Sequence, residues 1–406
     1  MTDIHVLFAT RILRLFAYGF LSVILVLYLA AAGLSASEIG LLLTLTLVGD
    51  TFISLWITTS ADRMGRKRML LVGAALMIFA GVLFAITHSF VPLLVAATVG
   101  VISPSGNEVG PFLAIEQAAL ADEVAAERRT RVFAWYNLAG SCATAVGALA
   151  GGGLAQVLQG RGLTPLASYR AVVVGYAIIG AAMVALFTRL SAAAEPPARA
   201  AGPQRPAFFH ADLGLGPSRR NVFKLASLFT MDAFAGGFVV QAFVAYWFHT
   251  RFGVAPATLG AIFFGANILA GVSALSATWL AARVGLLRTM VGTHLPSNVL
   301  LVLVPLMPTL PLAMAMLLAR FSISQMDVPT RQAYTMALVA PAERSAAAGV
   351  TGIARTIGAA LSPLLAGPLY ATAALASVPF FAAGGLKIVY DLLVWRTFRK
   401  VELPQG

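Results

Sequence analysis

Six ionisable side chains lie inside long apolar stretches of this sequence, with no opposite charge one helical turn away. They are Arg14, Asp50, Glu108, Glu116, Asp232 and Arg355. A charge at the centre of a bilayer costs about 2.5 to 3.5 kcal/mol unless it is paired or hydrated. A poorly solvated carboxylate is suited to gain and lose a proton, because burial disfavours its ionised form. We therefore predict that Asp50, Glu108 and Asp232 couple proton movement to function. The alternative is that each acid forms a structural ion pair or hydrogen bond between helices.

Glu108 lies in an unusual segment, Ser103-Pro104-Ser105-Gly106-Asn107-Glu108-Val109-Gly110-Pro111. Two prolines and two glycines should loosen a helix there and free backbone carbonyls at the depth of the acid. At 1.5 Å per residue, Glu108 lies about 21 Å from Asp122, and Asp50 about 18 Å from Asp62. Both acids are therefore expected near the middle of a membrane.

Two further acids have a base four residues away, which favours a local pair on one helix. These predicted pairs are Asp327 with Arg331 and Lys387 with Asp391. For Asp327 and Arg331 a second interpretation stays open, because Tyr334 extends the same polar face toward a possible cavity.

The arginines could attract an anionic group, and the aromatic residues could bind an apolar one. The predicted substrate-binding residues are Arg14, Tyr18, Asn107, Phe112, Phe234, Phe238, Asp327, Arg331, Tyr334 and Arg355. Aromatic residues in such sequences are more often packing or interfacial anchors.

The elements that carry these residues have the composition of membrane spans. The 406 residues are 59% hydrophobic and 11% charged, with a mean hydropathy of +0.86. Apolar runs of about 20 residues recur throughout, which is the length needed to cross a bilayer as a helix. We predict an all-α membrane protein with twelve spans, near residues 6–32, 38–59, 70–88, 91–120, 131–157, 168–190, 221–249, 256–281, 287–306, 311–339, 346–372 and 377–398.

The positive charge follows the predicted topology. The net charge is +12, and most basic residues fall in loops on one side, so both termini are expected in the cytoplasm. Nucleic-acid binding is disfavoured for the same reason. A single cysteine, Cys142, excludes a disulfide framework, and the sequence has no metal-ligand cluster, nucleophile motif or phosphate-binding loop. An enzyme, ATP-driven transport and a cofactor are therefore not expected.

The sequence also repeats itself. Residues 61–65, 116–118 and 126–128 recur at 281–285, 331–333 and 342–344, at offsets of about 215 to 220 residues. We predict two pseudo-symmetric six-helix bundles, residues 1–190 and 221–406, joined by a cytoplasmic linker, residues 191–220.

The charged turn between the second and third spans resembles a signature of the major facilitator superfamily. Asp62, Arg63, Gly65, Arg66 and Lys67 match its Asp-Arg-x-Gly-Arg-Lys/Arg pattern. The resemblance implies that one half rocks against the other, with the first, fourth, seventh and tenth spans lining a cavity and the third, sixth, ninth and twelfth facing lipid. It implies a cytoplasmic gate made by these five residues with Asp122 and Glu116.

Glycines at 140, 147 and 151–153 resemble the antiporter signature of exporters, although the proline of that signature is absent. Ile102 and Ser105 replace the Arg and Gln that drug exporters carry on the fourth span. We predict a proton-coupled exporter of a small organic molecule, amphiphilic or anionic. Its partners would be its substrate, protons and the lipid bilayer, and it would be a monomer in the inner membrane of a bacterial cell. The alternative is a uniporter or importer of a small organic anion, with the acids serving as structural partners.

Overall fold

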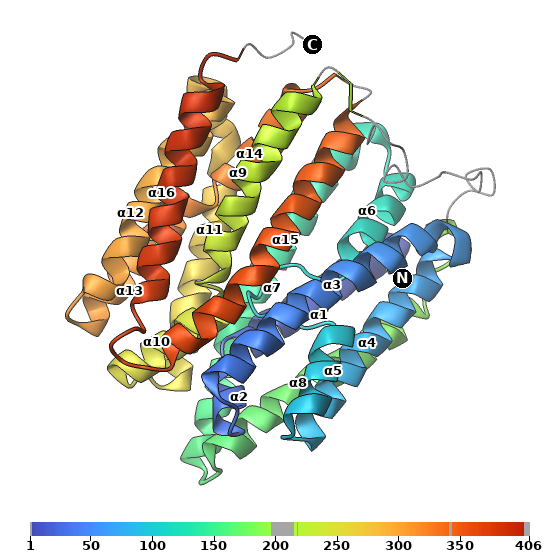
Figure 1. The fold of residues 1–406 in the computed structure, drawn as a ribbon. Helices are drawn as coiled ribbons and strands as arrows, with labels where there is room; N and C mark the ends of the chain where they lie inside the picture. The colour runs from blue at the N-terminus through green and yellow to red at the C-terminus, as the bar shows by residue number, and fades with distance from the viewer. Residues whose placement is uncertain (1, 196–214, 217, 341–342, 402–406) are drawn as a thin grey trace. The chain divides into compact units, whose positions relative to one another are not determined.

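The computed structural model describes residues 2–195, 215–216, 218–340 and 343–401, and in this part of the chain the regular structure is entirely helical (Figure 1). The α-helices are α1 (Asp3–Ser22), α2 (Leu25–Ala31), α3 (Ala36–Met64), α4 (Arg66–Ile86), α5 (Phe90–Val99), α6 (Phe112–Glu123), α7 (Ala126–Gly160), α8 (Pro165–Phe187), α9 (Arg219–Gly237), α10 (Gln241–Phe252), α11 (Pro256–Val284), α12 (Leu286–Leu303), α13 (Leu310–Ser324), α14 (Asp327–Ala337), α15 (Arg344–Tyr370) and α16 (Val378–Phe398). Two short 3-10 turns, Ala192–Ala194 and Val304–Leu306, complete the assignment. Most of the predicted linker, at 196–214 and 217, lies outside the described residues.

Ten segments of the described chain are long and apolar enough to cross a membrane. The protein is therefore a multi-pass membrane protein. Four of the twelve predicted spans, near 6–32, 91–120, 221–249 and 311–339, are each divided into two shorter helices. The count of twelve spans and the cytoplasmic placement of both termini stay predictions.

The break in the span near 91–120 is the one that its prolines and glycines predict. Helix α5 ends at Val99, and the chain resumes as α6 at Phe112. Between them, Gly106 and Gly110 have φ angles of +71° and +82°, a region that favours glycine. The interruption places Glu108 on irregular backbone between two helices.

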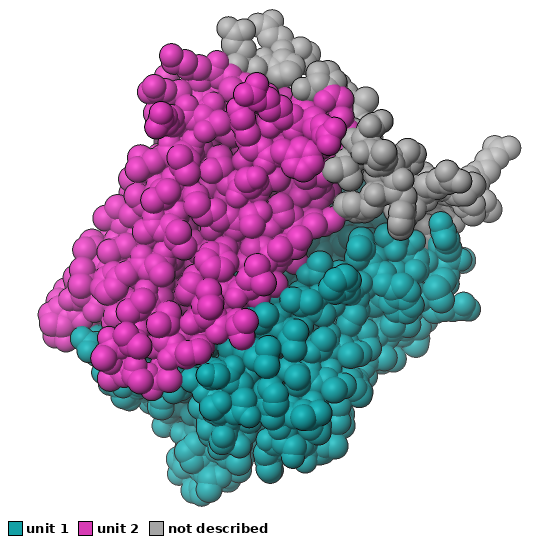
Figure 2. Space-filling model, viewed as in Figure 1, with its two compact units in different colours: residues 1–204, 240–264 teal, residues 205–239, 265–406 magenta. Residues whose placement is uncertain are grey.

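The chain divides into two compact units, coloured separately in Figure 2. Unit 1 contains residues 1–204 and 240–264, and unit 2 contains residues 205–239 and 265–406. Each is described by itself below. The boundaries of the predicted bundles, at 190 and 221, stay a prediction.

Each unit is held together by one especially close helix pair. In unit 1, α1 packs on the glycine face of α7, where a side chain at Gly147 or Gly151 would collide with the backbone of α1. In unit 2, α9 packs on α15, where a side chain at Gly358 would collide with the carbonyl of Thr230. Small residues allow this close backbone approach. Gly147 and Gly151 of α7 therefore have a packing role inside unit 1.

Candidate functional site

Unit 1 contains a buried ion cluster centred on Arg14 of α1. Its guanidinium binds Glu116 of α6 through two contacts of 2.7 Å and Glu108 through Nε at 2.8 Å. Arg14 and Glu116 are both fully buried, whereas the Glu108 side chain is 16% exposed. A bidentate arginine with two carboxylates is a strong charge-assisted arrangement.

Neighbouring side chains complete this cluster. Arg11, one turn before Arg14, forms an ion pair with Glu108 and lies over the ring of Tyr136, at 4.7 Å from its centroid. The Tyr136 hydroxyl and Thr10 Oγ1 both donate to Glu116, the latter at 2.9 Å. Glu108 and Glu116 are therefore paired between helices, which is the alternative to a free proton carrier. Their coupling roles stay predictions.

Asp50 differs from these two acids. It lies near the middle of the α3 span, partly buried, and its carboxylate accepts from Ser54 Oγ at 3.3 Å. Within the described residues, no Lys, Arg or His nitrogen comes within 4.0 Å of it. Of the three predicted proton-coupling residues, Asp50 is the one that the structure leaves without a cation.

Unit 2 contains a second cluster, centred on Asp232 of α9. The carboxylate receives Lys387 Nζ of α16 at 2.5 Å, Arg355 Nη1 of α15 at 3.0 Å and Arg331 Nη1 of α14 at 3.3 Å. Asp327 binds Arg331 at 2.7 Å, so the predicted local pair is confirmed. Arg355 is the accessible member, with a third of its side chain exposed.

The predicted pair of Lys387 with Asp391 is wrong. Lys387 turns to Asp232, while Asp391 binds His294 Nδ1 of α12 at 2.8 Å and Asn298 Nδ2 at 3.0 Å. The other ring nitrogen of His294, Nε2, lies 3.6 Å from Asp232. Two residues of α16 thus face two different partners in the interior of unit 2.

The charged turn of the predicted gate is held by ion pairing and by the segment after α8. Arg66 Nη1 binds Asp122 at 2.7 Å, as the resemblance implies. Glu195 accepts the backbone N–H groups of Arg66 and Lys67 at 2.6 and 3.1 Å. Gly65, with a φ of +99°, makes the turn between α3 and α4.

The remaining gate residues are placed differently. Arg63 is exposed, and the side chain of Asp62 lies outside the described part. Glu116 lies in the Arg14 cluster rather than beside Arg66. The gating roles of all these residues stay predictions.

Most of the predicted aromatic substrate ligands are packed inside their units. Tyr18 is buried and donates to the carbonyl of Val109 at 3.0 Å, and Phe112 stacks on Phe187 below the Arg14 guanidinium. Tyr334 packs edge-on to Phe398 in an apolar core of unit 2. Phe234 and Phe238 contact each other, and Asn107 is exposed. A substrate-binding role for these residues stays a prediction.

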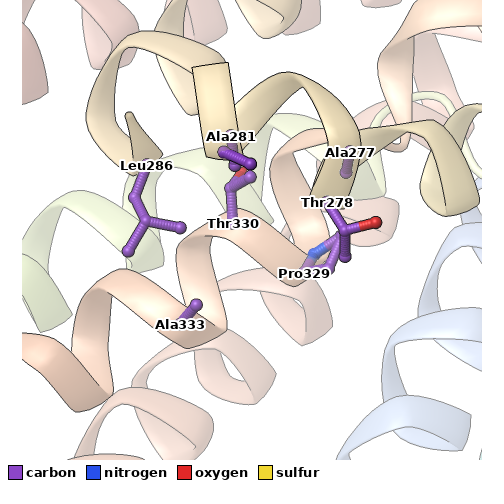
Figure 3. Close-up of a pocket in the computed structure, with 8 residues that line it drawn as sticks. Ala277, Thr278, Ala281, Leu286, Pro329, Thr330 and Ala333 are labelled. Carbon is purple, nitrogen blue, oxygen red and sulfur yellow. The ribbon is translucent and has the colours of Figure 1, made fainter. Parts of the chain in front are cut away.

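An open pocket of about 310 Å³ lies on unit 2 (Figure 3). Small and apolar side chains line it, from the α11–α12 corner at Ala277, Thr278, Ala281, Ala282 and Leu286 and from α14 at Pro329, Thr330 and Ala333. No predicted site residue belongs to its lining. In the described residues, no group of three His, Cys, Asp or Glu side chains is placed to hold a metal ion.

Sequence reasoning did not place Arg11, Tyr136, His294 and Lys387 in the two clusters. Arg11 had a usable signal, because it lies three residues before Arg14 and therefore on the same helix face. His294 and Lys387 lie on spans that the family resemblance assigns to lipid, so no pattern indicated that they face inward.

The long apolar helices with their buried ion pairs define a polytopic membrane protein. A family model described as Major Facilitator Superfamily matches residues 7–363. The chain belongs to the major facilitator superfamily, and it is a transporter and not an enzyme.

Two relatives were found by sequence. An uncharacterized membrane protein of Saccharomyces cerevisiae, YJR124C, is 30% identical over 425 residues, which cover 98% of this chain and 95% of the yeast protein. The quinolone resistance protein NorA of Staphylococcus aureus is 25% identical over 155 residues, which cover 38% of this chain and 39% of NorA.

Solved transporters share the fold. A D-xylose-proton symporter superposes with a TM-score of 0.75 at 14% identity, covering 97% of each chain. The nucleoside transporter NupG superposes with a TM-score of 0.74 at 14% identity, covering 99% of this chain and 100% of that one.

Proposed function

We propose that this transporter is driven by protons and exports a small organic molecule, amphiphilic or anionic, by alternating access of two six-helix bundles. The proposed setting is a monomer in the cytoplasmic membrane of a bacterial cell. In this mechanism, a proton on an acid within the spans changes the relative stability of the inward-open and outward-open states.

The observation that supports proton coupling best is the environment of Asp50. A carboxylate at mid-span that accepts from a hydroxyl, with no Lys, Arg or His nitrogen of the described residues within 4.0 Å, is costly as an anion, so it favours taking up a proton. One proton moving down about 100 mV releases about 2.3 kcal/mol, so one such acid can drive substantial accumulation.

An anionic group on the substrate is supported by Arg355. Its Nη1 binds Asp232, and its side chain is one-third exposed. A guanidinium carries five N–H donors, so the others can bind a second, incoming anion. Arg331 binds the same Asp232 carboxylate and adds positive charge, although its own side chain is almost fully buried.

Export is supported by the partial likeness to NorA, a quinolone resistance protein. Removal of a toxic compound is the simplest way in which a transporter confers resistance. The solved neighbours give no direction, because at 14% identity they share only the fold.

The test first needs a ligand. A thermal-shift screen of chemically diverse compounds in detergent can find one, because a ligand that binds the folded protein raises the melting temperature of the protein. Substrate movement in proteoliposomes should then reverse when the pH gradient is inverted. Asp50→Asn should abolish this pH-driven movement, while Glu38→Gln, at the start of the same helix, should leave it unchanged. Transport that is unaffected by Asp50→Asn, Glu108→Gln and Asp232→Asn together would remove the carrier assignment.

A second function is favoured by the ion pairs themselves. Glu108, Glu116 and Asp232 each have a basic partner, as expected for acids with a structural role. In that case the protein is a uniporter or importer of a small organic anion. Uptake that is insensitive to a protonophore would select this function over proton-coupled export.

A further inference from the structure

One carboxylate of unit 2 is buried beside a histidine instead of a permanent cation. Asp391 is fully buried, with His294 Nδ1 at 2.8 Å from Oδ1 and Asn298 Nδ2 at 3.0 Å from Oδ2. Within the described part of the chain, no Lys or Arg nitrogen lies within 4.0 Å of this carboxylate. A buried carboxylate surrounded by neutral groups is strongly disfavoured as an anion. A second proton on the imidazole would neutralise this carboxylate directly.

The other acids of the cluster need no such proton. Asp232 receives Lys387, Arg355 and Arg331, and Asp327 receives Arg331. Lysine and arginine ordinarily carry their charge well above neutral pH, so each of these carboxylates already has a basic partner. Histidine is different, because its ordinary charge change falls between pH 5 and 8. Asp391 is thus the acid whose neutralisation depends on an exchangeable proton.

The second ring nitrogen of His294, Nε2, faces Asp232 at the centre of the cluster. Nε2 lies 3.6 Å from Asp232 Oδ1, the same oxygen that Lys387 approaches at 2.5 Å. A neutral imidazole carries one N–H, whereas an imidazolium carries two. Only the doubly protonated ring can therefore direct N–H groups at Asp391 and Asp232 together.

Two further ionisable groups surround the pair. The ring of Tyr390 lies edge-on to His294, with centroids 5.7 Å apart, and Arg320 lies on α13, which packs against α12. Asn298 Oδ1, on the side chain that binds Asp391, is buried without a hydrogen-bond partner among the described residues.

We propose that Asp391 and His294 form a proton-binding site between α12 and α16, and that its single exchangeable proton controls how tightly α12 is tied to both α9 and α16. The site adds a specific proton-binding position to the proposed proton coupling. Its role in transport therefore rests on the proposal that the transporter is driven by protons. Arg355, which contacts Asp232 and is one-third exposed, links the buried pair to the surface of unit 2.

Nitrogen NMR of the full chain in lipid nanodiscs, with ¹⁵N-labelled histidine, tests the site without any substrate. The sequence has five histidines, so the His294 signals are assigned from His294→Gln, or by eliminating the other four if that variant does not fold. We expect the ring to carry two protons at pH 5.5 and to lose the Nε2 proton by pH 9, keeping the proton on Nδ1. Asp391→Asn should remove the doubly protonated ring at pH 5.5.

Two outcomes would overturn the proposal: a His294 ring in one protonation state from pH 5 to 9, or a neutral ring with its proton on Nε2. His249→Gln is the control, because His249 binds the carbonyl of Val254 in unit 1 and should not alter the His294 signals. The transport assay is separate. If His294 titrates but transport does not respond to the pH gradient, the proton-binding site stands and the proposed proton coupling falls. If transport responds to the pH gradient but His294 does not titrate, only the proposed site falls.

Discussion

Arg14 and Glu116 form a bidentate ion pair, in which Nη1 lies 2.7 Å from Oε1 and Nη2 lies 2.7 Å from Oε2. Both side chains are fully buried. The pair ties α1 to α6, directly after the break that carries Glu108. Glu108 reaches the same guanidinium, so the irregular segment is fixed by charge where it lacks helical hydrogen bonds. The cluster is therefore a structural support for the predicted site.

Arg14→Lys and Glu116→Gln should both destabilise the protein strongly. Disruption of a buried ion pair costs about 3 to 5 kcal/mol, because the remaining charge stays buried. Lysine keeps the charge but cannot form the two parallel contacts. Thermal melting in detergent measures the loss, with Arg170→Gln as the control, since Arg170 contacts His88 at the surface. Equal melting temperatures for Glu116→Gln and Arg170→Gln would contradict the structural role.

The glycine face of α7 supplies a second prediction. A methyl group at Gly147 would collide with the carbonyl of Phe16, whereas nothing lies within 4 Å of a methyl group at Gly153. Gly147→Ala should therefore cost about 1 to 3 kcal/mol through overpacking. Gly153→Ala should be neutral or stabilise by up to about 1 kcal/mol, because alanine favours the helix. Melting curves of the two variants compare them directly, and a Gly147→Ala protein as stable as the wild type would show that α1 and α7 are not in close contact.

Local sequence patterns predicted much of the fold and part of the site. Apolar runs located the helices, and the prolines and glycines at 104–111 located the break. Fourfold spacing predicted the contact of Asp327 with Arg331, because both partners lie on one helix. The same rule was wrong for Lys387 and Asp391, since each side chain has a partner on another helix.

The partners of Asp232 could not be predicted in this way. Arg331, Arg355 and Lys387 lie 99, 123 and 155 residues further along the chain. Contacts between helices depend on how each helix is rotated and on which helices are neighbours, and a single sequence carries no periodic signal for either. The family resemblance gave no guide here, because it assigns the helices of His294 and Lys387 to the lipid without saying which of their residues face inward.

Glu343 gives a prediction for pH. Hydrogen bonds from the Ser218 side chain and from the Gly216 amide lower the pKa of its carboxyl group, which lies outside the spans. A carboxylate with a lowered pKa stabilises the folded contact above the pKa of the unfolded chain, near pH 4.5, and this stabilisation is lost as the pH falls through the folded value. The Gly216 amide should therefore exchange hydrogen faster, after correction for intrinsic rates, below about pH 4.5. In Glu343→Gln that acid-induced acceleration should disappear, and its persistence would assign it to another group.

Glu195 gives the last prediction, which concerns the charged turn. Its carboxylate accepts the N–H groups of Arg66 and Lys67, the first two residues of α4, and so caps a helix whose N-cap position, Gly65, has no side chain. A carboxylate there also complements the positive end of the helix dipole. Glu195→Ala should destabilise this turn by about 0.5 to 2 kcal/mol, and Glu195→Gln by less, since an amide keeps one acceptor. Hydrogen exchange at Arg66 and Lys67 measures the change, while Glu38→Ala, which removes the carboxylate of the α3 capping box, should affect α3 instead. Unchanged exchange at both amides in Glu195→Ala would mean that the segment after α8 does not hold the turn in solution.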